Sequence, residues 1–227
     1  ILRARNIQGL IVAPQEHDNT RFDLDFSHFA AVALGYSMRP ALLPIVTNHQ
    51  VQSTTLLVEK LAGMGYKRIG LYLHPEWDRK VNHGYVAGFT TAQQSLAPKN
   101  RLKPFMPEEI FDMRVFRRWF EKTRPDAIIT QGIAQTLISW LKPLRVPDDV
   151  GIATLTARED EPEIAGVHQS DRLIGATAAD VVIGMLQRNE RGLPANLTYT
   201  LVGGVWRPGP SLRPQTASKP GCPPKAA

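Results

Sequence analysis

Polar and aromatic side chains gather directly after the short apolar runs of this sequence, where a binding site would form. The set comprises Tyr36, His74, Trp77, Arg79, Gln131 and Thr156. The rings of Tyr36 and Trp77 are suited to stacking on the apolar face of a sugar or of another ring. The remaining polar members can direct hydrogen bonds to a ligand. Their shared position predicts a small-molecule binding cleft.

Each of these residues also has an ordinary structural interpretation. Trp77 can be a packed loop residue, and Tyr36 can cover the end of a strand. Arg79 can pair with Asp78, with Glu76 or with solvent. Because no single residue decides between the two interpretations, the prediction of a cleft depends on the whole set.

Sequence patterns for catalysis are absent. The chain has neither a GxxxxGK[ST] phosphate loop nor a GxGxxG turn, and it lacks the GxSxG and HExxH motifs. Its histidines are not paired at metal-ligand spacing, and the lone Cys222 lies in a Pro-rich tail. We therefore expect no enzyme activity, no cofactor and no metal site.

The order of the apolar runs indicates the fold class. Helical patterns separate short runs that are rich in strand-forming residues. The expected strands are residues 8–13, 30–34, 68–73, 126–130 and 150–155, and the expected helices are 50–64, 79–96, 113–122, 133–141 and 171–189. Parallel strands need long crossovers, so this alternation predicts an α/β fold whose parallel sheets are covered by helices.

Composition and charge agree with a soluble globular protein. The 227 residues are 43% hydrophobic, and no apolar stretch approaches the length that spans a bilayer. A single Cys favours the reducing cytoplasm. The net charge is +6, but residues 99–124 alone hold eight basic against four acidic residues. This surplus is either solvated surface or an anion-binding patch.

Several segments, in order, resemble the effector-binding region of the lactose-repressor (LacI/GalR) family of bacterial transcription regulators. They are QGLIV (8–12), LLVEKLAGMGYKRIGL (56–71), VAGF (86–89), RPDAIIT (124–130), VPDDV (146–150) and HQSDRLIG (168–175). The resemblance covers about residues 6–211. It implies a two-lobed, periplasmic-binding-protein-like fold that closes on a small molecule.

The resemblance also implies how the chain is divided. We expect residues 1–44 in the N-terminal lobe, 45–167 in the C-terminal lobe, 168–197 back in the first and 198–211 back in the second. Residues 212–227 are expected to form a disordered tail. Because the sequence opens without Met and inside the first lobe of the family pattern, we expect an N-terminally truncated chain with that lobe incomplete.

The family's ligand contacts transfer poorly to this sequence. Tyr85 stands where the family has an Arg, and Thr156 replaces an Asp. Gly132 and Ile133 replace a polar pair, with Gln131 just before them. Gln169 matches a family Gln near the crossover between the lobes, where it serves either as a hinge or pocket residue or as a structural hydrogen-bond partner.

The function implied is sensing of a sugar or sugar derivative bound between the lobes of a regulator, most simply a repressor. Such a regulator reads operator DNA through a helix-turn-helix that this chain does not contain, and it acts as a homodimer. The resemblance puts residues 135–141 at the dimer interface, although ordinary helix packing explains them equally well. The alternative is a periplasmic solute-binding receptor of the same fold.

Overall fold

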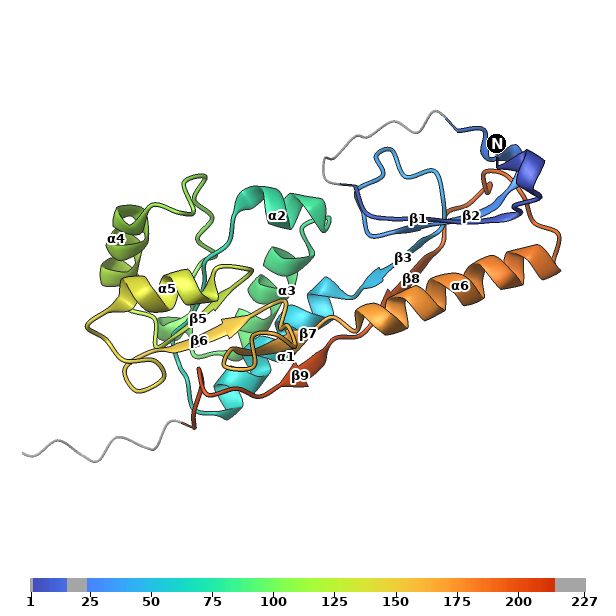
Figure 1. Cartoon of the computed structure of the whole chain (residues 1–227). Helices are drawn as coiled ribbons and strands as arrows, with labels where there is room; N and C mark the ends of the chain where they lie inside the picture. The colour runs from blue at the N-terminus through green and yellow to red at the C-terminus, as the bar shows by residue number, and fades with distance from the viewer. Residues whose placement is uncertain (1, 16–23, 215–227) are drawn as a thin grey trace, which may run out of the picture.

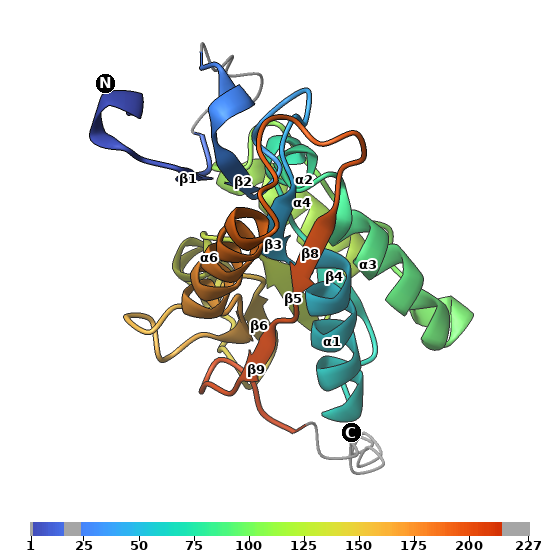
Figure 2. The same cartoon turned by 90° about the vertical axis from the view of Figure 1, so that its right-hand side faces the viewer.

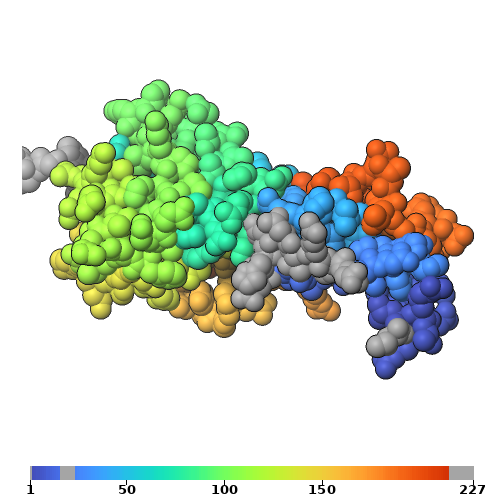
Figure 3. All heavy atoms as spheres, turned by 90° about the horizontal axis from the view of Figure 1, so that it is seen from above, coloured from blue at the N-terminus to red at the C-terminus, as the bar shows by residue number. Residues whose placement is uncertain are grey.

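Two β-sheets organise the chain, and each carries its own covering of helices. The computed structural model describes residues 2–15 and 24–214. The sheets lie side by side along an elongated molecule, with the first at one end and the second at the other (Figures 1 and 3). The predicted class, an α/β fold with parallel sheets flanked by helices, is confirmed.

The first sheet has four parallel strands in the order β1-β2-β3-β8. Their bounds are Gly9–Val12, Ala30–Leu34, Ile45–Asn48 and Tyr199–Val202. Helix α6 (Asp171–Gln187) covers one face, where Ala178 and Val182 pack on Val32. The alternate β2 residues, Ala31 and Ala33, point to the opposite core, as the two-residue period of a strand requires.

The second sheet has five strands in the order β4-β5-β6-β7-β9, of which only β9 is antiparallel to its neighbour. Their bounds are Ile69–Leu71, Ala127–Thr130, Gly151–Thr154, Ala165–His168 and Val205–Arg207. Helices α1 (Gln50–Gly63) and α3 (Gly84–Ala92) cover one face. Helices α4 (Met113–Thr123) and α5 (Ala134–Leu141) cover the other.

Helices α1 and α3 pack closely because a glycine lies at their contact. A Cβ atom built on Gly88 would lie 2.5 Å from the carbonyl oxygen of Val51 and 3.0 Å from the Thr54 side chain. These distances are too short for ordinary carbon contacts. Gly88 therefore sets the separation of the two helices on this face of the sheet.

The expected helix at residues 79–96 is wrong, because the chain breaks it into α2 (Pro75–Lys80) and α3. Asn82 and His83 adopt positive φ angles of 54° and 61°, which an α-helix cannot contain. The turn is held by Asp78, which is 1% exposed and accepts hydrogen bonds from Val86 N at 3.0 Å and from His83 Nδ1 at 3.1 Å.

The chain passes between the sheets three times: after β3, after β7 and after β8 (Figures 1 and 2). The expected lobe boundaries at residues 45 and 198 need correction. They placed β3 and β8 in the second lobe, whereas both strands belong to the first sheet and pair with each other from Ile45↔Tyr199 to Asn48↔Val202. The crossovers therefore come after these strands, not before them.

The C-terminal segment is ordered further than expected. Leu212 is buried in the core of the second sheet, and the backbone N–H of Arg213 donates to the Tyr66 hydroxyl. Residues 212–214 therefore do not belong to a disordered tail, and residues 215–227 lie outside the described part of the chain. Across the described residues, no helix combines the length and apolarity needed to cross a membrane.

Candidate ligand-binding site

A buried hydrogen-bond cluster lies where the chain crosses between the sheets. Tyr85 of α3 is 1% exposed, and its hydroxyl accepts a hydrogen bond from Gln169 Nε2 at 3.0 Å. Gln169 directly follows β7 and also donates to the Leu155 carbonyl at 3.4 Å. The structure thus brings together two of the residues that the sequence singled out.

Burial raises the pKa of Tyr85 to about 12, and the neighbouring amides of Gln169 and Asn48 act in the opposite direction. The phenol is therefore protonated at neutral pH and can both donate and accept a hydrogen bond. Asn48 is the last residue of β3 in the first sheet, and Tyr85 lies on α3, which packs on the second sheet. The cluster therefore joins the two halves of the molecule.

Asn48 is held in place by its neighbours. Its Oδ1 accepts hydrogen bonds from Gln50 Nε2 at 2.9 Å and from Thr47 Oγ1 at 3.2 Å. At a second crossover, Gln52 Oε1 accepts the backbone N–H of Gly204 at 3.1 Å. These bonds fix the crossover strands to the start of α1 and hold the cluster in a defined arrangement.

Unpaired polar atoms lie at the carboxyl end of β5. Thr130 Oγ1 and Gln131 Oε1 are buried, and neither has a hydrogen-bond partner within residues 2–15 and 24–214. Thr156 follows the adjacent strand β6, and its backbone N–H donates to Thr154 Oγ1 at 3.3 Å. A buried polar atom without a partner costs about 1–3 kcal/mol, so these two atoms are candidates for contact with a ligand.

His74, Trp77 and Arg79 have partners within their own segment. His74 caps α2 by accepting the Glu76 N–H at 3.2 Å, and its ring lies 5.7 Å from that of Trp77. Trp77 is half-buried against both cores of the second sheet. Arg79 forms an ion pair with Glu76 at 2.9 Å. Capping, packing and ion pairing thus account for their positions.

The loops beside α2 connect the sheets directly. Arg39, which follows β2, donates from Nη2 to the Arg79 carbonyl at 2.5 Å. Tyr36 lies in the same first-sheet loop, with its ring centroid 6.3 Å from that of Tyr199. The structure therefore places Tyr36 against its own sheet and does not bring it to the Tyr85 cluster.

Sequence reasoning missed Asn48, Thr130 and Asp78. Asn48 is the last residue of the four-residue strand β3, which was not predicted, although the polar run after Ile45 and Val46 was a usable signal. Thr130 was counted only as the end of a strand. Within the described ranges, no group of three His, Cys, Asp or Glu side chains is placed to hold a metal ion.

Comparison with known proteins identifies the family. Residues 58–204 match the model of the periplasmic binding protein-like domain. This match covers more than half of the chain, which therefore belongs to that family. No curated protein sequence matches the chain significantly.

Solved structures share this fold. A LacI family transcriptional regulator from Enterococcus faecium with bound ribose has a TM-score of 0.67 at 16% identity, over 95% of this chain and 83% of that one. A putative ribose operon repressor from Burkholderia thailandensis has a TM-score of 0.63 at 23% identity, over 90% and 79%. A periplasmic binding protein/LacI transcriptional regulator from Alkaliphilus metalliredigens QYMF, complexed with D-xylulofuranose, has a TM-score of 0.66 at 13% identity, over 93% and 80%.

Proposed function

We propose that this chain is the effector-sensing domain of a LacI-type transcription regulator, a repressor, and that its effector binds between the two sheets. The observation that carries the proposal is the pair of buried, unpartnered atoms Thr130 Oγ1 and Gln131 Oε1. They lie at the carboxyl end of the parallel strand β5, and this end of the strands is where α/β sheets bind ligands.

The polar groups around this position favour a neutral, hydroxyl-rich ligand such as a sugar or sugar derivative. The side chains of Asn48, Thr130, Gln131, Thr156 and Gln169 are all amides or hydroxyls. A charged ligand would need an opposite charge here to offset its desolvation. The ribose and D-xylulofuranose held by two of the similar structures support the same ligand class.

The proposed mechanism is a shift between two arrangements of the lobes. We propose that the first lobe consists of residues 1–48 and 170–202. The second lobe then consists of residues 49–169 and 203–214. A ligand that contacts both lobes stabilises the arrangement in which they are closer together. In a homodimer this motion changes the spacing of two DNA-binding heads on the operator.

We propose that operator DNA is bound by a helix-turn-helix that the present chain does not contain. We also propose that the regulator works in the cytoplasm. For the dimer we propose the outer face of α5, where Gln135 is exposed and donates to the Glu163 carboxylate.

A thermal-shift screen tests the proposed function. The panel contains D-ribose, D-xylulose, cellobiose, nucleosides and sugar acids. We expect at least one sugar, at a concentration of about 100 Kd, to stabilise the chain by about 2.7 kcal/mol and to raise Tm by about 5–10 °C. A flat response across the panel would contradict the proposal.

The matched variants are Thr130→Val and Thr200→Val. The first removes the unpartnered hydroxyl from the site, and the second makes the same change in β8. We expect Thr130→Val to reduce the sugar-induced shift and Thr200→Val to leave it unchanged. Equal effects of the two variants would place the ligand elsewhere.

A further inference from the structure

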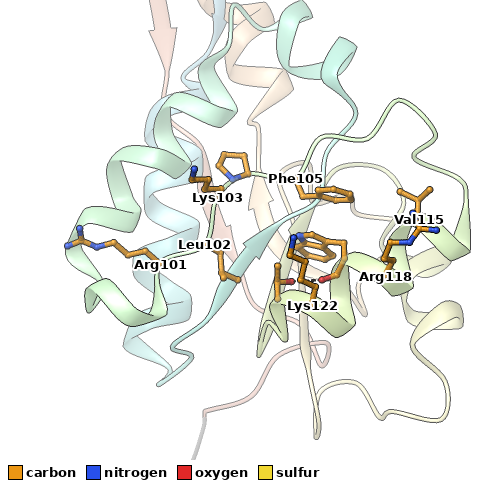
Figure 4. Close-up of a pocket in the computed structure, with 10 residues that line it drawn as sticks. Arg101, Leu102, Lys103, Phe105, Val115, Arg118 and Lys122 are labelled. Carbon is orange, nitrogen blue, oxygen red and sulfur yellow. Dashed lines mark hydrogen bonds between the residues drawn. The ribbon is translucent and has the colours of Figure 1, made fainter.

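A separate apolar hollow lies on the second sheet, between the extended segment 101–105 and helix α4 (Figure 4). Its volume is about 520 Å³, within the range of small-molecule sites. The apolar part of its lining consists of Leu102, Pro104, Phe105, Val115 and Trp119. None of these residues belongs to the hydrogen-bond cluster of Asn48, Tyr85 and Gln169 described above.

The floor of the hollow is firmly built. Phe105 donates its N–H to the Leu71 carbonyl at 2.9 Å and accepts from Leu73 N at 3.1 Å, which ties the segment to the edge of the sheet. The ring of Trp119 stacks on Phe105 at 5.5 Å with an interplanar angle of 9°. The indole passes over Gly70, where a Cβ would lie 2.9 Å from Trp119 Cη2.

Three cations on the rim lack partners. Lys103, Arg118 and Lys122 line the hollow and are exposed, and none of their side chains has a hydrogen bond or ion pair with the described part of the chain. A fourth rim cation, Arg101, is bound to Gln94 and to backbone carbonyls. The lining contains no Asp or Glu.

This pattern differs from the rest of the surface. Several other exposed arginines bind a carboxylate two to four residues away, as do Arg114, Arg145, Arg158 and Arg188. The rim therefore presents unneutralised positive charge beside buried apolar surface. It is also where the sequence concentrates its basic surplus, between residues 99 and 124.

We propose that this hollow is a second ligand site, for a small anionic amphiphile with an aromatic or short acyl body and a carboxylate or phosphate group. The apolar lining would bury the body, and the rim cations would bind the anion through charge-assisted hydrogen bonds. This inference goes beyond the proposed function and stands independently of it.

An added peptide strand fits the hollow less well. The edge segment contains Pro104, which has no N–H to donate, and both backbone groups of Phe105 already face inward to β4. Main-chain pairing along this edge is therefore blocked. A neutral sugar would leave the three rim cations unpaired, so the occupant is expected to be anionic.

Isothermal titration calorimetry with naphthalene-2-carboxylate tests the proposal on the full chain. We expect saturable binding with a Kd on the order of 100 μM. The uncharged naphthalene-2-carboxamide should bind at least about tenfold more weakly, because the rim cations lose their partner. Absence of saturable binding, or equal affinity for the amide, would overturn the proposal.

Variants locate the site. The double variant Arg118→Gln/Lys122→Gln should weaken naphthoate binding about tenfold. The control Lys60→Gln/Arg172→Gln removes the same charge from exposed positions on α1 and α6 and should leave binding unchanged. Equal weakening by both doubles would show general charge attraction and would overturn the assignment.

A filling variant gives independent evidence. Val115→Trp should abolish naphthoate binding by occupying the hollow, with an unchanged melting temperature as the check on folding. Gln131→Leu, at the separate sugar site, should leave naphthoate binding intact. Loss of binding with Gln131→Leu but not with Val115→Trp would place the anion between the lobes and refute a second site.

Discussion

The Gly88→Ala variant is expected to lose about 3 kcal/mol of unfolding free energy and about 6–12 °C in Tm. The added Cβ would lie 2.5 Å from the Val51 carbonyl oxygen, and a backbone atom cannot move aside as a flexible side chain can. Helix α3 must therefore shift away from α1. Chemical denaturation monitored by circular dichroism measures the loss.

The matched control is Gly175→Ala in α6. A Cβ at Gly175 meets nothing within 4 Å, so only the helix propensity changes there. Alanine should stabilise this helix by about 0.5–1 kcal/mol. If both variants were equally destabilised, close packing at Gly88 would not be the cause.

The Gln131→Leu variant is expected to be more stable than the parent and yet to bind sugar about 100-fold more weakly. Leucine removes the whole amide, including its buried, unpartnered oxygen, and this should gain about 1 kcal/mol in the free protein. The ligand would then lose the partner that orients it, and its own polar group would stay unpaired. Denaturation and calorimetry on the same preparation measure both effects.

Gln169→Leu makes the same chemical change where the amide is already paired. Gln169 donates to the Tyr85 hydroxyl and to the Leu155 carbonyl, so its loss should cost about 1–2 kcal/mol of stability. The two Gln→Leu variants therefore should move the unfolding free energy in opposite directions. A gain of stability in both would mean that the amide of Gln169 does not hold the crossover.

Much of the fold could be predicted because its long elements carry strong patterns. The strands at 126–130 and 150–155 are built around short apolar runs, and α6 follows a clear 3.6-residue period. Strand β3 was missed because two of its four residues, Thr47 and Asn48, are polar, and strand β8 was missed because Thr200 interrupts its apolar residues. Since their pairing is long-range, the lobe boundaries at 45 and 198 were misplaced with them.

Local chemistry limited the prediction of the site. The apolar spacing after Arg79 predicts a single helix. In the structure this helix is interrupted at Asn82 and His83, which have left-handed backbone angles, beside the buried Asp78. Tyr85 and Gln169 were found through motifs, but their mutual hydrogen bond joins residues 84 positions apart. Likewise, the sequence shows a cluster of cations without showing which of them lack partners.

The central claim, that a sugar bound between the sheets brings the lobes together, is tested most directly by a distance between them. Spin labels are attached at Asp180→Cys in α6 and at Glu121→Cys in α4, on a Cys222→Ser background. Pulsed electron paramagnetic resonance then measures the distance between the two labels. The distribution of distances between the labels should narrow and change when the sugar that stabilises the chain, D-ribose, D-xylulose or cellobiose, is added. An unchanged distribution at saturation would contradict the account.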